Sequence, residues 1–136
     1  MKLCILISMF LILPASVMAQ GLAKVVEPLR VSLSDDSTAT ATDKAFNELL
    51  RLELNERATV RFTQAKFDYR VLTATAEITS KGKLTGYSAA VAVLTQAEGK
   101  EVSLRLHVMV GPTLDAVASD AGAFLEKELQ TKRRKK

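Results

Sequence analysis

Cysteine and histidine are nearly absent from this chain of 136 residues, which has one of each, Cys4 and His107. Cys4 lies in an apolar leader that we expect to be removed, so the remaining chain has no thiol chemistry and no disulfide. A zinc site needs three or four nitrogen or sulfur ligands, and this composition nearly excludes one. A small secreted domain without disulfides depends on its core alone, which favours a bacterial periplasm over an animal extracellular module.

The motifs of several common chemistries are also missing. There is no G-x-S-x-G nucleophile elbow and no glycine-rich phosphate loop. Asp35 and Asp36 are the one carboxylate pair that invites a calcium interpretation, but the spaced ligands of a calcium loop are lacking. We therefore expect no cofactor, no metal ion and no catalytic set.

The first 19 residues have the pattern of a secretory signal peptide. Lys2 gives a positive start, and the apolar run Leu3–Leu13 is too short to span a bilayer. Val17 and Ala19 supply the small residues of a cleavage site, so we predict cleavage between Ala19 and Gln20 and a periplasmic or secreted protein. No second apolar run is long enough for a transmembrane span. The alternative is a buried amino-terminal helix in a cytosolic protein.

Charge is concentrated at the carboxyl end. Without the leader, 117 residues carry a net charge of +3, and without the last five the net charge is −2. A folded nucleic-acid surface should spread basic residues over one face, so we expect no specific nucleic-acid partner. Residues 20–131 then form one domain and residues 132–136 a basic tail. The candidate contacts for a polyanion or an anionic membrane are Lys132, Arg133, Arg134, Lys135 and Lys136. The alternative is a solvated end that complements the helix dipole.

Hydrophobic periodicity predicts the elements of the first half. Alternation after Pro28 predicts a strand, and an apolar stripe with three- and four-residue spacing predicts a helix over 41–56. Thr40 with Asp43 resembles a capping box at the start of that helix. The alternating segment 59–63 predicts a second strand.

The segment 67–79 predicts a longer strand whose apolar phase changes. Phe67, Tyr69 and Val71 share one face, whereas the apolar residues from Leu72 onward share the other. A bulge near Val71 and Leu72 would keep both sets against one core. The alternative is burial of both faces in turn along the strand.

Two further strands and a helix complete the chain. A hairpin loop at 80–83 leads to a strand at 84–96, whose run of apolar residues is typical of a central strand covered on both faces. In the strand 101–110, alternation predicts that Val102, Leu104, Leu106, Val108 and Val110 face inward. The last helix, expected over 114–130, has Thr113 as its N-cap.

These elements predict a single α+β domain. The expected architecture is a four- or five-stranded, mostly antiparallel sheet with two helices packed on one face, in the order β-α-β-β-β-β-α. The first strand can add a parallel pair at one side.

The distinctive polar residues of the domain are Asp68, Tyr69, Arg105 and His107. Asp68, Tyr69 and His107 suggest a small hydrolase or lyase, provided that these three converge on one pocket. The other interpretation places Asp68 at a strand edge beside Arg70 and leaves His107 on the solvent side of the sheet.

The order of segments resembles a known type of domain. A strand, a polar loop and a helix precede FDYRVLTATAEI, GYSAAVAVLT, EGKEV and the small-residue helix LDAVASDAGAFLEKEL. This pattern resembles the TolB amino-terminal domain and the CsgG-type assembly lipoproteins of bacterial envelopes. The chain departs from them in lacking a lipobox cysteine and a following propeller. The resemblance implies an envelope scaffold or assembly role without catalysis, and it assigns no functional residues.

The leading expectation is therefore a non-catalytic module that binds another envelope component. The alternatives are the hydrolase or lyase and an accessory protein that binds an anionic surface through its tail.

Overall fold

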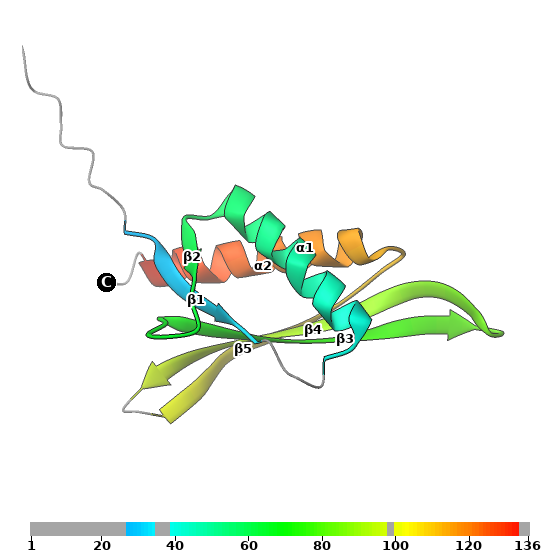
Figure 1. Ribbon diagram of the computed structural model, residues 1–136, viewed down its shortest axis with the longest axis horizontal. Helices are drawn as coiled ribbons and strands as arrows, with labels where there is room; N and C mark the ends of the chain where they lie inside the picture. The colour runs from blue at the N-terminus through cyan, green and yellow to red at the C-terminus, as the bar shows by residue number, and fades with distance from the viewer. Residues whose placement is uncertain (1–26, 35–38, 98–99, 134–136) are drawn as a thin grey trace, which may run out of the picture.

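A five-stranded sheet with both helices on one side forms the body of the protein (Figure 1). The structure is a computed structural model that describes residues 27–34, 39–97 and 100–133. The elements are β1 (Leu29–Leu33), α1 (Ala41–Arg57), β2 (Val60–Phe62), β3 (Tyr69–Ser80), β4 (Lys83–Ala97), β5 (Lys100–Gly111) and α2 (Leu114–Arg133). The α+β class and the element order are confirmed. The expected leader, its cleavage site, Asp35 and Asp36 lie outside the described residues.

The strands are ordered β2-β1-β3-β4-β5 across the sheet. The first strand does pair in parallel, since β1 runs parallel to both β2 and β3. Strands β3, β4 and β5 form an antiparallel meander, in which β5 is an edge strand.

Local signals set the ends of both helices. The hydroxyl of Thr40 accepts from the amide of Asp43, and the Asp43 carboxylate accepts from the Thr40 amide, which confirms the capping box. The Thr113 hydroxyl accepts from the amide of Ala116 at 3.2 Å. Helix α2 continues to Arg133, so Lys132 and Arg133 belong to the helix, whereas residues 134–136 lie outside the described residues.

The β3–β4 hairpin forms at residues 80–83, where the composition predicted a hairpin loop. Ser80 pairs with Lys83, and the two loop residues have positive φ, 50° at Lys81 and 75° at Gly82. Positive φ at both positions is the signature of a type I′ turn, whose twist matches that of the strands.

The core lies between the helices and one face of the sheet. The helices bury the stripes that their periodicity predicted. The fully buried large side chains are Phe46, Leu50, Leu54, Val117, Leu125 and Leu129 from the helices and Val31, Leu33, Val71, Val91 and Val93 from the strands.

The expected bulge in β3 is wrong. Pairing with β4 is unbroken from Tyr69 to Ile78, and the register shifts only between Ile78 and Thr79. The apolar residues from Leu72 to Ile78 therefore stay on the side away from the helices, and burial of both faces in turn also fails because Ala74 and Ala76 are exposed. The helix side is continued instead by threonines that bond to α1.

The expected burial of β4 and β5 also needs correction. Only one face of β4 is fully buried, through Ala89, Val91 and Val93. In β5 the inward phase is reversed, because Met109 is 4% exposed whereas Val108 and Val110 are 60% and 70% exposed. Val102 and Leu106, also predicted to face inward, are exposed as well.

A bulge in β5 breaks the alternation on which that prediction depended. Arg105 pairs with Val93 and Ser103 pairs with Leu94, which leaves Leu104 as an extra residue. An extra residue shifts every later side chain to the opposite face, because side chains alternate with a period of two.

Candidate functional site

The face of β3, β4 and β5 that points away from the helices is apolar and uncovered by any described element (Figure 1). We call this surface the open face. Apart from the polar Ser88 of β4, it consists of Leu72, Ala74, Ala76 and Ile78 of β3, Ala90, Ala92 and Leu94 of β4, and Leu106, Val108 and Val110 of β5. Large contiguous apolar surfaces of this kind mark interaction sites, whereas single exposed apolar residues do not.

The open face has a ridge beside a trough. The ridge consists of Leu106, Val108 and Val110, which are 65%, 60% and 70% exposed along the edge strand. The trough consists of the small side chains of β3 and β4 next to it. The register gives the rows Leu72–Ala92–Leu106, Ala74–Ala90–Val108 and Ala76–Ser88–Val110.

Charged groups lie at one end of the open face and are largely paired. Arg70 contacts Glu101 at 2.9 Å, beyond the row of Leu72. On β1, the Arg30 guanidinium contacts both carboxylate oxygens of Asp68, at 3.0 and 3.3 Å. These hydrogen bonds to Asp68 raise the pKa of Arg30, so its guanidinium stays positively charged.

Basic residues gather at the β1–β2 end of the sheet. Arg61 pairs across the parallel ladder with Arg30, and both line a surface hollow. Lys66 lies close by, beside Arg61 in a neighbouring hollow. The last turns of α2 reach this same end, because Leu129 and Gln130 line a pocket together with Leu29.

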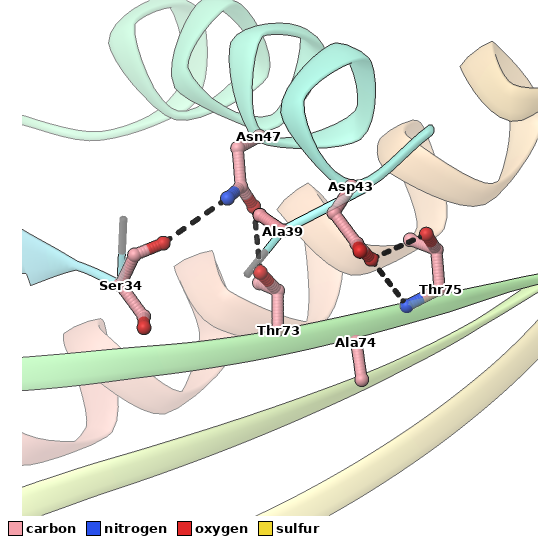
Figure 2. A pocket seen from close by; sticks show the side chains of 7 residues that line it. All are labelled: Ser34, Ala39, Asp43, Asn47, Thr73, Ala74 and Thr75. Atoms are coloured by element: carbon pink, nitrogen blue, oxygen red, sulfur yellow. Dashed lines mark hydrogen bonds between the residues drawn. The ribbon is translucent and has the colours of Figure 1, made fainter. Parts of the chain in front are cut away.

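A separate hollow, of about 150 Å³, lies where α1 meets β3 (Figure 2). The Asn47 side chain donates to the carbonyl of Ser34 at 3.1 Å and accepts from the Thr73 hydroxyl at 2.6 Å. Asp43 accepts from the amide and hydroxyl of Thr75. These hydrogen bonds hold the pKa of Asp43 at about 2, with Thr75 contributing most. Because these groups satisfy one another, the cluster serves to fix α1 on the sheet.

The four polar residues singled out from the sequence have separate surroundings. Asp68 pairs with Arg30, not with Arg70. Tyr69 is buried on the helix side, and that burial raises the pKa of its hydroxyl. Arg105 contacts Glu128 of α2 at 3.7 Å.

His107 lies on the helix side of β5 rather than on the solvent side. Its ring stacks on Phe124 with 4.6 Å between centroids, and its Nε2 is 4.0 Å from an Asp120 carboxylate oxygen.

These residues do not converge on one pocket. Tyr69 lies opposite Thr95 of β4, whereas His107 lies opposite Val91, four residues along β4 and on the next strand. The strand geometry separates the two backbones by roughly 16 Å. Sequence reasoning therefore grouped residues that the sheet keeps apart, and it missed the open face. The signal that could have revealed that face is the shortage of helices, since two helices on one side leave the other side bare.

No protein-family model matches this chain, and no curated protein matches it. Within the described residues, neither helix is long and apolar enough to cross a membrane. In the same part of the chain, no group of three or more His, Cys, Asp or Glu side chains is placed to hold a metal ion. The open face is thus the feature on which a functional argument can be built.

Proposed function

We propose that this chain is an exported, non-catalytic binding or assembly module of the bacterial envelope that docks another component on its open face. The observation that carries this proposal is the exposure of Leu106, Val108 and Val110, side by side on the edge strand. Full burial of a valine or leucine side chain contributes about 2 kcal/mol, so covering this surface would supply several kcal/mol to association.

The amino-terminal sequence supports export. The apolar run Leu3–Leu13, followed by small residues at Val17 and Ala19, fits a cleaved leader. The rest of the chain has no cysteine, so it has no thiol that an oxidising compartment could convert to a disulfide.

Site-specific photo-crosslinking tests docking on the open face. A photoreactive amino acid replaces Val108 in the chain exported by its own leader, and the cells are irradiated. We expect covalent products of raised mass from this position. Leu52, an equally exposed residue (60%) on α1, is the matched control and should give few crosslinked products. Equal yields from the two positions, or none from Val108, would overturn the proposal.

One observation favours a second function, contact with an anionic surface. The end of α2, where the basic tail begins, lies at the same end of the molecule as Arg61 and Lys66. Each Lys or Arg near an anionic membrane adds about 1 kcal/mol of binding free energy. Replacing residues 132–136 by glutamine should abolish retention on vesicles of anionic phospholipid at low salt. Replacing Lys81 and Lys83 by glutamine is the control, and unchanged retention of the tail variant would reject this function.

A hydrolase or lyase site gains no support from the geometry. Asp68 is held by Arg30, and His107 lies against Phe124 two strands away.

A further inference from the structure

We propose that the occupant of the open face is a second copy of this chain, packed face to face about a two-fold axis parallel to the strands. This inference rests on the proposed docking function and names its partner. It makes the protein a symmetric dimer in which two sheets enclose a second core.

The shape of the open face is self-complementary. The ridge on β5 lies beside the trough of alanines on β3 and β4, with Val108, Ala90 and Ala74 in one row. A two-fold axis along β4 lays the ridge of each copy over the small side chains of the other. Interdigitation of large and small side chains is how two sheets pack about 10 Å apart.

The charge distribution also permits this contact. No residue in the three rows from Leu72 to Val110 is charged, and Arg70, in the row of Leu94 at one end, is paired with Glu101, so two copies bring no unpaired like charges together. The Arg70–Glu101 and Arg30–Asp68 pairs lie at the rim and are neutralised within each copy. An anionic lipid would instead require basic groups within the face.

The size of the open face fits a sheet better than a single peptide strand. The three rows that span β3, β4 and β5 project to about 300 Å² from strand spacings alone. One extended peptide would cover a third of this width and leave the rest in water. A second copy covers all three strands.

The mass of the protein purified from the periplasm is the first test. Sedimentation equilibrium of the wild type should give twice the chain mass, and Val108→Glu should raise the dissociation constant by about 100-fold, as loss of an interface hot spot does. Leu52→Glu places the same charge at an equally exposed residue on α1 and should leave the dimer unchanged. Circular dichroism of each variant shows whether the monomer remains folded.

A second variant separates a copy from any other apolar occupant. Ala90→Leu fills the trough but keeps the face apolar, so it should weaken the dimer at least about 10-fold, because the added methyl groups overpack the contact between the two sheets. A lipid or a flexible apolar ligand would bind that variant as well as the wild type or better.

The outcomes distinguish this inference from the docking function. A wild type that stays monomeric while Val108 still gives crosslinks overturns the dimer and leaves the docking function standing. Absence of crosslinks from Val108 defeats both. A dimer that tolerates both Val108→Glu and Ala90→Leu uses another surface and also overturns the inference.

Discussion

The carboxylate of Asp43 accepts hydrogen bonds from both the amide and the hydroxyl of Thr75, at 2.9 and 2.6 Å. The same carboxylate accepts from the amide and hydroxyl of Thr40. One side chain therefore caps α1 and fastens that helix to β3. This arrangement explains why threonines, rather than apolar residues, continue the helix side of β3.

Loss of this carboxylate should destabilise the fold in a pH-dependent way. The pKa of Asp43 is lowered from 3.8 to about 2, so its charge stabilises the fold above pH 4 and this contribution disappears as the pH falls toward 2. Asp43→Asn should cost about 1 to 2 kcal/mol at pH 7, after allowance for partial exposure. Urea unfolding at pH 7, 4 and 2 measures the difference, which should shrink across this range. Glu48→Gln, on the exposed side of α1, is the control, and a constant difference for Asp43→Asn contradicts the prediction.

Asn47 should contribute through its buried amide. It is 4% exposed and links the Ser34 carbonyl to the Thr73 hydroxyl. Asn47→Leu leaves the Ser34 carbonyl and the Thr73 hydroxyl without their hydrogen bonds to this side chain. This loss should lower the unfolding free energy by about 2 kcal/mol. A double-mutant cycle with Thr73→Val should show a coupling of about 1 kcal/mol. Strict additivity would mean that the bond to Thr73 contributes nothing.

Truncation of two neighbouring residues of β5 should change the stability of the fold by very different amounts. Met109→Ala removes a buried side chain and should cost about 2 to 3 kcal/mol. Val110→Ala removes an exposed one and should change the stability of the monomer by less than about 0.5 kcal/mol. Thermal unfolding of dilute protein, in which association is negligible, makes the comparison. A larger effect at Val110 would place the other face of β5 against the helices.

Gly122 should resist replacement although it lies within α2. A Cβ built at this position would meet the Cβ of Glu53 on α1 at 2.9 Å, too short a distance for a real contact. Alanine is favoured over glycine in a helix by about 1 kcal/mol, but the two helices would have to separate. Gly122→Ala should therefore lower the unfolding temperature. A higher unfolding temperature would show that the helices adjust without cost.

Export should be visible in the mass of the isolated protein. Cleavage between Ala19 and Gln20 predicts a chain that begins at Gln20, recovered from the periplasm or the medium. Intact-mass spectrometry of each cell fraction makes the measurement. Ala19→Arg should block cleavage, because the −1 position requires a small residue. An unclipped wild-type chain in the cytosol would reject the leader and, with it, the envelope setting.

The amino-acid sequence by itself determined the features that depend on neighbours along the chain. The Thr40–Asp43 capping box, the Lys81–Gly82 turn and the buried stripe of α2 follow from local spacing, because helix and turn geometry repeat over a few residues. The order of elements follows from the same periods.

Tertiary structure alone decided which face of each strand is covered and which distant groups meet. The extra residue at Leu104 reverses the phase of β5. The alternation of side chains along a strand also does not show which face of the sheet the helices cover. Asp68 meets Arg30 because β1 enters the sheet parallel to β3, a pairing that joins segments far apart in the sequence. Packing between distant segments also creates the open face. The two helices bury one side of the sheet, and the local sequence pattern does not show which side that is.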